Sequence, residues 1–310
     1  MSQSFLQSKS WEGFQNSLGR KTFWIDDRLV IKMPMVLGQS YLYSARCSFK
    51  NIEELKQFLE KTKKIGKTEN AFFIRFEPEN FDFDIDKLGL KKVNSRQPED
   101  TLMVNLNCSL EEILAAMKPK CRYNINLAKK KDVKIEVSTD PKDIDIFYNI
   151  AEETARRDKI RFFPKDYYEL MAKSLTKNGF LVIYFARYEN RYLAASVMLM
   201  YDDTAIYLHG ASTDRDRNIM APYFLQWQAI EDAKKAGKKY YDFWGISPLA
   251  VEDTRYKIQD TNHAWEGISR FKMGFAPTEK TGIYRHYPGC YEESYGKKRY
   301  FVYSMFKKVM

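Results

Sequence analysis

The sequence predicts a soluble α/β protein with two domains. The chain has 310 residues, about twice the length of one typical domain. Short apolar runs alternate with helical patterns along it, which is typical of α/β proteins. Apolar residues make up 44% of the chain, enough for two cores, and no run is long and apolar enough to span a membrane.

In the first half, apolar and alternating runs predict strands at 24–33, 39–44, 71–76 and 101–106. A helix is predicted at 52–65, because its apolar side chains fall on one face: Ile52, Leu55, Phe58, Leu59 and Thr62. A second helix is predicted at 110–117, where Ser109 and Glu112 have the spacing of a capping box.

The second half begins with a basic segment at 118–131, in which Ile125 and Ala128 lie on one helical face and the cations point outward. We expect a junction between the domains at Pro141. The elements predicted around and after it are a strand at 133–137, helices at 143–157 and 165–177, strands at 180–188, 192–201 and 205–210, a helix at 222–236 and a strand at 240–244. Two helices, three antiparallel strands, a helix and a strand are the order of an N-acetyltransferase-like (GNAT) unit. The first half has a looser version of this order.

Charge and cysteine content limit the classes of function. The net charge of +10 and the pI of about 9.1 favour polyanionic partners, although a solvated basic surface is the alternative. The four cysteines contain no Cys-x-x-Cys pair, and the three histidines share no ligand spacing with them, so no metal site is expected. The N-terminus lacks the apolar core of a signal peptide, which predicts the reducing cytoplasm.

Several motifs in the same order resemble the FemABX family of peptidoglycan non-ribosomal peptidyltransferases. In the first half they are residues 10–14, 73–78, 97–101 and 117–129. In the second half they are residues 153–158, 209–212, 221–227, 239–246 and 269–275. There is room for only one helix between Arg157 and Phe180, so the chain resembles the compact FemX type without a helical arm.

The resemblance implies two GNAT-like domains, at 1–141 and 142–284. Residues 285–310 would return to the first domain, with a strand near 300–306. It implies transfer of an amino acid from aminoacyl-tRNA, as donor substrate and without a further cofactor, to an amine of the stem peptide in UDP-MurNAc-pentapeptide or lipid II. We expect a cytoplasmic monomer that contacts the inner membrane surface peripherally.

The reaction that the resemblance implies is aminolysis of an ester, which develops negative charge on a tetrahedral oxygen. A fixed cation stabilises such a charge. Phe271 and Lys272 match the family's Phe-Lys position, which implies Lys272 as this cation; the alternative is an ordinary surface lysine near a strand. Glu77 matches an acidic residue considered as the general base. Its alternative role is that of a structural carboxylate bonded to nearby backbone.

Further residues are expected to bind substrates. Arg75 shares a strand face with Glu77, so it would pair with Glu77 or bind a substrate carboxylate or phosphate. By resemblance, Arg161 and Tyr167 flank the loop that binds the precursor's diphosphate, although Phe163 occupies the family's arginine position. Tyr207 and His209 are expected to alternate onto one strand face beside the substrate, and a structural histidine is the alternative for His209.

The basic helix offers Lys129, Lys130 and Lys131 as contacts for tRNA phosphates, with a solvated helix face as the alternative.

Two other functions compete with this interpretation. An acyl-CoA-dependent GNAT N-acyltransferase needs a glycine-rich loop whose amides bind pyrophosphate. Here the loop covers 217–222, where Met220 replaces a glycine and Pro222 removes an amide. A non-catalytic RNA-binding protein is supported by charge and aromatic content alone.

Overall fold

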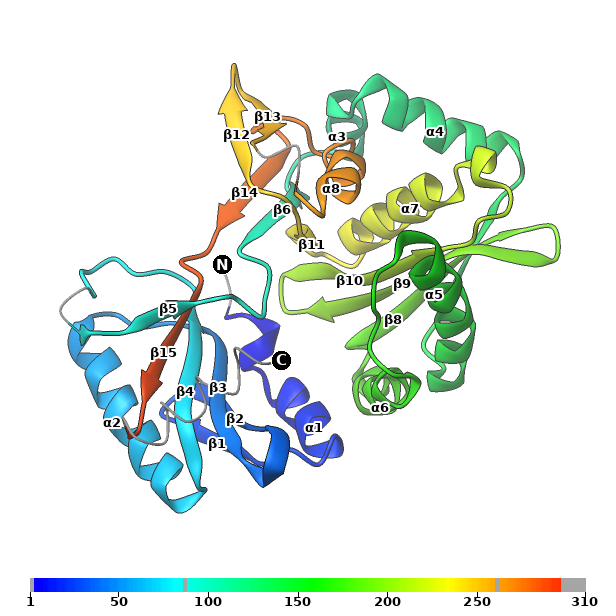
Figure 1. The fold of residues 1–310 in the computed structure, drawn as a ribbon. Helices are drawn as coiled ribbons and strands as arrows, with labels where there is room; N and C mark the ends of the chain where they lie inside the picture. The colour runs from blue at the N-terminus through cyan, green and yellow to red at the C-terminus, as the bar shows by residue number, and fades with distance from the viewer. Residues whose placement is uncertain (1–2, 86–87, 260–262, 297–310) are drawn as a thin grey trace. The chain divides into compact units, whose positions relative to one another are not determined.

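The computed structural model describes residues 3–85, 88–259 and 263–296, and it divides them into two compact units. One unit contains residues 3–99 together with 287–296, and the other contains residues 100–286 (Figure 1). Each unit has a mixed sheet with helices, so the predicted α/β class is confirmed. Among the described helices, none combines the length and apolar character needed to cross a bilayer.

The unit formed by 3–99 and 287–296 is built on a six-stranded sheet. Its strands, in spatial order, are β1 (Thr22–Ile25), β2 (Arg28–Pro34), β3 (Ser40–Cys47), β4 (Ala71–Pro78), β15 (Cys290–Ser294) and β5 (Lys91–Val93). Neighbours are antiparallel except β3 and β4, which are parallel and joined by helix α2 (Ile52–Thr68). Helix α1 (Lys9–Ser17) precedes β1.

Helix α2 forms where its sequence predicts. Asn51 caps it, since the side chain accepts a hydrogen bond from the Glu54 N–H at 2.9 Å. The predicted apolar face is buried, and its members Leu55, Phe58 and Leu59 pack in one core with strand residues such as Ile74. This packing fixes the crossover that makes β3 and β4 parallel neighbours.

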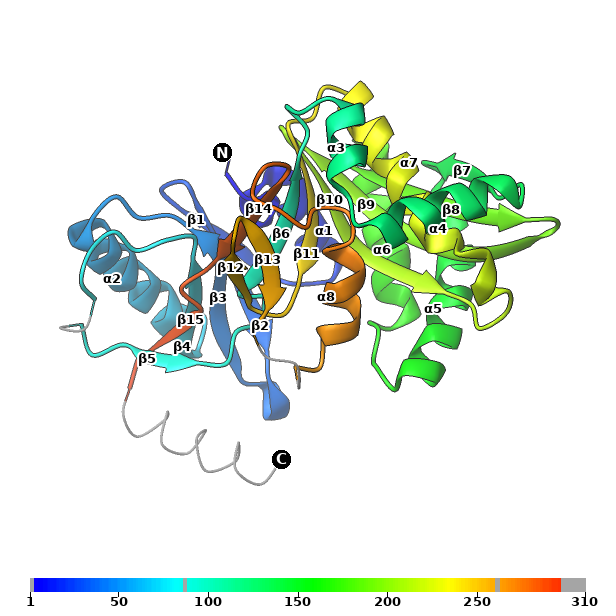
Figure 2. The ribbon, with the colours of Figure 1, turned by 90° about the horizontal axis from the view of Figure 1, so that it is seen from above.

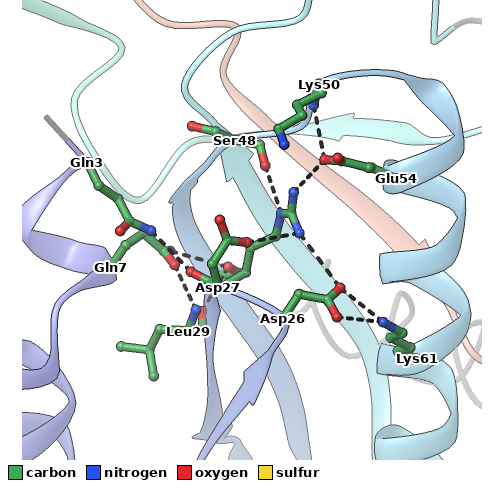
Figure 3. A network of polar contacts seen from close by, with 11 residues as sticks. Gln3, Gln7, Asp26, Asp27, Leu29, Ser48, Lys50, Glu54 and Lys61 are labelled. Carbon is green, nitrogen blue, oxygen red and sulfur yellow. Dashed lines mark hydrogen bonds and ion pairs between the residues drawn. The ribbon is translucent and has the colours of Figure 1, made fainter. Parts of the chain in front are cut away.

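The strand predicted at 24–33 is instead a hairpin of β1 and β2. Asp26 adopts a left-handed conformation (φ 55°), which turns the chain between the two strands. Arg28 then holds this turn near α2, because its guanidinium bonds to the Ser48 carbonyl (2.7 Å) and to Glu54 (2.8 Å). In Figure 3, Asp26 points toward Lys61 of α2, at an N–O distance of 2.7 Å.

The unit formed by 100–286 has a seven-stranded sheet. Its strands, in spatial order, are β14 (Gly282–His286), β6 (Asp100–Asn105), β11 (Tyr240–Gly245), β10 (Thr204–Ser212), β9 (Arg191–Tyr201), β8 (Leu181–Tyr188) and β7 (Lys134–Ser138). The described helices are α3 (Leu110–Ala116), α4 (Pro119–Lys130), α5 (Ile144–Asp158), α6 (Lys165–Leu175), α7 (Ala221–Lys235) and α8 (Glu266–Lys272). Figure 2 shows α8 beside a separate hairpin of β12 (Leu249–Glu252) and β13 (Arg255–Ile258).

Helices cover both faces of this sheet. In β8, Val182, Tyr184 and Ala186 belong to a core that includes residues of α4 and α7. Leu181 and Ile183 are also buried, and alternation turns them to the opposite face, where α5 packs against β8, β9 and β10. The predicted capping box of α3 is present, with both the Ser109 and the Glu112 side chains bonded to backbone N–H groups.

The boundary between the units differs from the expected position at 141. Residues 100–141 belong with 142–286, because β6 pairs with β11 and β14 rather than with the first sheet. The expected return of the chain end is present from residue 287, where β15 inserts between β4 and β5. The strand expected near 300–306 lies outside the described residues.

The two sheets repeat one pattern, as predicted. In each, three antiparallel strands lead into a helix and a strand parallel to the third: β1, β2, β3, α2 and β4, or β8, β9, β10, α7 and β11. A further strand then pairs antiparallel with the last one, β15 with β4 and β6 with β11. The chain is therefore a tandem of GNAT-like units.

Candidate active site

The candidate site lies where β10 and β11 separate. These parallel strands pair only through Thr204–Ile206 and Tyr240–Asp242, although β10 continues to Ser212 and β11 to Gly245. Trp244 is left-handed (φ 59°), which turns the end of β11 away from regular pairing. On the edge that faces β10, the end of β11 therefore offers backbone groups to partners other than a strand, while Gly245 still pairs with Thr101 of β6 on the other edge.

Lys272, at the end of α8, is one of these partners. Its Nζ donates to the Gly245 carbonyl oxygen at 2.6 Å and lies 5.6 Å from the centroid of the Tyr207 ring. The residue is 6% exposed. Burial lowers the pKa of Lys272 to about 7, against the opposing influence of the Asp242 charge. The alternative of a surface lysine near a strand does not agree with this position, because Lys272 is buried on a helix.

The Gly245 carbonyl is itself held in place. The Asp242 carboxylate accepts hydrogen bonds from the Trp244 N–H (2.7 Å) and from the Thr101 hydroxyl, which is also 3.1 Å from the Trp244 carbonyl oxygen. On the other side, the Ile246 N–H donates to a β6 carbonyl at 3.0 Å. The acceptor for Lys272 is thus fixed by β6 and by the Asp242 side chain of its own strand, β11.

Phe271 is partly buried beside α7. Its ring is edge-on to Tyr223 at 4.9 Å and to Phe275 at 5.4 Å. These contacts anchor α8 immediately before Lys272. Phe271 therefore helps to hold α8 against its aromatic neighbours.

Tyr207 and His209 lie on opposite faces of the sheet, so the expectation of a shared face is wrong. Tyr207 pairs with Met198 of β9, whereas His209 pairs with the adjacent Val197, because a bulge inserts one extra residue between them. Tyr207 therefore joins the face with Phe243, at a ring distance of 6.3 Å, and with Lys272. Burial raises the pKa of Tyr207.

His209 joins an aromatic group with the start of α6. Its ring is 5.2 Å from Tyr168 and 6.1 Å from Phe163. Burial lowers the pKa of His209 to about 4, so the imidazole is neutral at pH 7. Tyr167 stacks on Phe163 at 4.1 Å, while Arg161 is exposed in the loop before α6.

Arg75 and Glu77 belong to the other unit, on β4. Glu77 is 1% exposed and accepts the backbone N–H groups of Arg96 (2.7 Å) and Gln97 (3.1 Å). Burial raises the pKa of Glu77, although these hydrogen bonds oppose the effect. Arg75 forms an ion pair with Glu292 of β15, so the expected Arg75–Glu77 pairing is not the arrangement found. The surroundings of Glu77 agree with the structural alternative.

Lys129, Lys130 and Lys131 end α4 with exposed side chains. The opposite face of α4, including the predicted Ile125 and Ala128, is buried where α4 packs on α7. The Lys129 Nζ lies 5.1 Å from the centroid of the Phe224 ring of α7. The three cations therefore point outward, as the periodicity predicts.

The loop before α7 lacks the glycines of a phosphate-binding loop. Met220 is left-handed (φ 60°) at the start of the helix, and Pro222 is in its first turn. Pro222 has no N–H to offer at this end of the helix.

The sequence interpretation missed the residues that hold Lys272. Gly245 acts through its backbone carbonyl, which carries no side-chain signal. Asp242 lies within the segment 239–246 that resembles the family, and a carboxylate between the buried aromatic residues Tyr241 and Phe243 was the available sign of a special role. Thr101 is remote in sequence from both.

Comparisons with known proteins agree with this fold. The Acetyltransferase (GNAT) domain family matches residues 117–258. A lipid II:glycine glycyltransferase of Staphylococcus haemolyticus is 21% identical, with 71% of each chain covered. A UDP-N-acetylmuramoylpentapeptide-lysine N(6)-alanyltransferase of Weissella viridescens is 20% identical, with 81% of this chain and 82% of that protein covered.

A crystal structure of FemX has the same fold, with a TM-score of 0.75 over 93% of this chain and 92% of FemX at 16% identity. Two transferase relatives thus match most of the chain in sequence, and the chain shares its fold with FemX. The similarity to glycyl- and alanyltransferases over most of the chain, together with the fold shared with FemX, supports the FemABX family and an aminoacyltransferase activity.

Proposed function

We propose that this chain moves an amino acid from aminoacyl-tRNA to an amine of a peptidoglycan stem peptide. The relatives from S. haemolyticus and W. viridescens are named for lipid II and for the UDP-linked pentapeptide, which supports a precursor of this class as acceptor. The observation that carries the proposal is the buried Lys272 amine, fixed on the Gly245 carbonyl where β10 and β11 separate.

Lys272 would stabilise the transition state. The acceptor amine bonds to the carbonyl carbon of the aminoacyl ester, and negative charge collects on the carbonyl oxygen. One Nζ–H of Lys272 is bonded to Gly245, which leaves the remaining donors for this oxygen. The ester bond to the ribose then breaks, and the leaving ribose oxygen gains a proton to become a hydroxyl as the attacking amine loses one, so no net proton is released. The ester is already activated, so no covalent nucleophile is needed.

The donor is proposed from charge and from the loop before α7. Lys129, Lys130 and Lys131 form an outward cationic edge suited to phosphates of tRNA. Met220 and Pro222 make the loop a poor cradle for the pyrophosphate of CoA. These features favour aminoacyl-tRNA over an acyl-CoA donor.

We propose that the acceptor binds to residues on the sheet face beside Lys272 and to residues of the loop before α6. Tyr207 lies beside Lys272, whereas Arg161 and Tyr167 offer a cation and a stacked ring for the precursor's diphosphate. His209, on the opposite face of the sheet, would act on the acceptor only by supporting Phe163 and Tyr168 of that loop. We propose a cytoplasmic monomer, which would contact the inner membrane surface when the acceptor is lipid-linked.

The test is to incubate the protein with a mixed aminoacyl-tRNA pool and either UDP-MurNAc-pentapeptide or lipid II. Mass spectrometry should show one added amino acid on an acceptor, and ribonuclease treatment of the donor should abolish it. A parallel reaction with acetyl-CoA should give no product. Acetylation in that reaction, with none from aminoacyl-tRNA, would replace the proposal with the acyl-CoA alternative.

A further inference from the structure

The segment that follows β11 is tied to α8 at two points. Lys272 donates to the Gly245 carbonyl, and the Ser247 N–H donates to the Ser269 hydroxyl oxygen at 2.8 Å. Ser269 and Lys272 are three residues apart, so they lie on the same side of α8. The two bonds therefore act as a pair between one helix face and residues 245–247.

Ser269 and Ser247 are fully buried, each with 0% exposure. Their hydroxyl oxygens are 3.1 Å apart, and the Ser269 oxygen also lies 2.7 Å from the Trp265 carbonyl oxygen. A buried hydroxyl with this many partners holds the backbone more firmly than packing alone, because breaking any contact leaves a polar group without water.

His263 gives the hydroxyl chain a direction. Its Nδ1 accepts the Trp265 N–H at 3.1 Å and lies 3.1 Å from the Ser247 hydroxyl oxygen. Since Nδ1 accepts a backbone N–H in this arrangement, it carries no proton, and the Ser247 hydroxyl donates to it. The Ser269 hydroxyl has a single proton, which it donates to the Ser247 oxygen or to the Trp265 carbonyl, while its own oxygen accepts the Ser247 N–H. The chain of contacts runs from His263 through Ser247 to Ser269, one helical turn before Lys272.

We propose that Ser269, supported by Ser247 and His263, is a positioning residue that fixes the Gly245 carbonyl and α8 so that the Lys272 ammonium faces the reacting carbonyl. The kinetic part of this proposal rests on the proposed function. The geometric part concerns the free protein alone.

The first experiment compares kcat and KM for transfer by Ser269→Ala and wild type. We expect kcat to fall by about 10-fold to 10²-fold with KM for both substrates unchanged, because a displaced cation weakens transition-state binding alone. Thr281→Val is the matched control: it removes a buried hydroxyl of the same unit that has no hydrogen-bond partner among the described residues. Its kcat should equal that of wild type.

The second experiment tests His263 by replacement and rescue. His263→Ala removes the acceptor for Ser247, whereas His263→Asn places an amide oxygen near the position of Nδ1. We expect His263→Ala to lower kcat in the same direction as Ser269→Ala, and His263→Asn to recover part of the loss. Equal kcat for wild type and His263→Ala would overturn the part assigned to His263.

The third experiment needs no substrate. Protein labelled with ¹³C at the lysine Cε is titrated by NMR, and the Lys272 signal is assigned with Lys272→Arg. A carbonyl acceptor favours the ammonium form, so loosening Gly245 in Ser269→Ala should lower the Lys272 pKa further. An unchanged or raised pKa, in variants whose circular dichroism matches wild type, would overturn the proposal. If Ser269→Ala does not fold, Ser247→Ala replaces it in the same titration.

The outcomes separate this inference from the proposed function. If wild type transfers no amino acid but the Lys272 pKa still moves in Ser269→Ala, the function fails and the positioning stands. If wild type is active and neither kcat nor pKa responds to Ser269→Ala, the positioning fails and the function stands.

Discussion

The hydroxyl oxygen of Tyr207 occupies the space in which Gly210 would carry a Cβ atom, 1.7 Å from its ideal position. Tyr207 lies over Gly210 on the same strand, and its ring lies beside the Lys272 Nζ. The absence of a side chain at Gly210 is therefore what allows Tyr207 its place next to Lys272.

Gly210→Ala should displace the Tyr207 ring and reduce transfer. The backbone of Gly210 is not left-handed, so the effect comes from the collision alone, which should also cost about 1–3 kcal/mol of stability. Gly13→Ala is the control, since a Cβ at this helical glycine meets nothing within 4 Å, and it should stabilise by about 0.5–1 kcal/mol. Wild-type kcat in Gly210→Ala would show that the ring position is irrelevant to the reaction.

Lys272→Ala should lower kcat by about 10²–10³, or roughly 2.7–4 kcal/mol, while both substrates still bind. Lys272→Arg should recover part of this, because the charge remains but its geometry differs. Single-turnover transfer with saturating tRNA is the decisive measurement. Transfer by Lys272→Ala at the wild-type rate would remove Lys272 from the mechanism.

The rate advantage of wild type over Lys272→Arg should fall as pH rises through about 7. The pKa of Lys272 is lowered to about 7, so its cationic form is lost above this pH, whereas arginine stays charged. The acceptor amine titrates in the same way with both enzymes, so its effect cancels in the ratio of their transfer rates. A ratio that does not change between pH 6 and pH 9 would contradict the low pKa.

The same pKa shift predicts a dependence of stability on pH. The folded pKa of about 7 lies below the ordinary 10.5, so between these values the unfolded chain binds more protons and the free energy of unfolding rises with pH. Lys272→Met should lose this contribution. At about 1.4 kcal/mol per pKa unit, the free energy of unfolding of the variant should exceed that of wild type at neutral pH by at most about 5 kcal/mol. Urea unfolding of both proteins from pH 6 to pH 10 measures it.

Replacing Lys129, Lys130 and Lys131 by alanine should raise KM for aminoacyl-tRNA. The slope of log affinity against log salt should flatten by about 0.7–0.9 for each lost phosphate contact. The matched control replaces the exposed Lys56, Lys64 and Lys67 of α2, which removes the same charge from the other unit. Equal slopes for the two triple variants would show that the lysines at the end of α4 are a solvated face without contacts to tRNA phosphates.

Periodicity predicted most of the regular elements well, because the buried faces of α2, α4 and the β8 to β10 strands carry continuous apolar patterns. It failed where a single residue changes the backbone. Asp26 splits one apolar run into a hairpin, and the bulge between Tyr207 and His209 turns two side chains to opposite faces. Helix α8 is too short for its period to be read from seven residues.

In the candidate site, the sequence could predict the residues that act through their side chains, but not those that act through their backbone. Lys272 stands in a motif, but its acceptor is the backbone of Gly245, and the bond depends on a tertiary turn. The boundary at 99 and 100 was missed for a similar reason: the apolar run of β6 shows that it is a strand, but it does not say which sheet it joins.

The chain enters the second unit at residue 100 and returns at residue 287, so one continuous unit is inserted into another. On the ribosome, β4 (ending at Pro78) is made early, but its neighbour β15 (starting at Cys290) follows only after about 210 further residues. At roughly 5–20 residues per second, this leaves an edge of the first sheet without its strand for about 10–40 s. The inserted unit meanwhile receives all of its strands in one uninterrupted stretch. The later part of the chain can thus fold before the earlier part is complete, and the nascent protein must protect the open edge of β4 during that time.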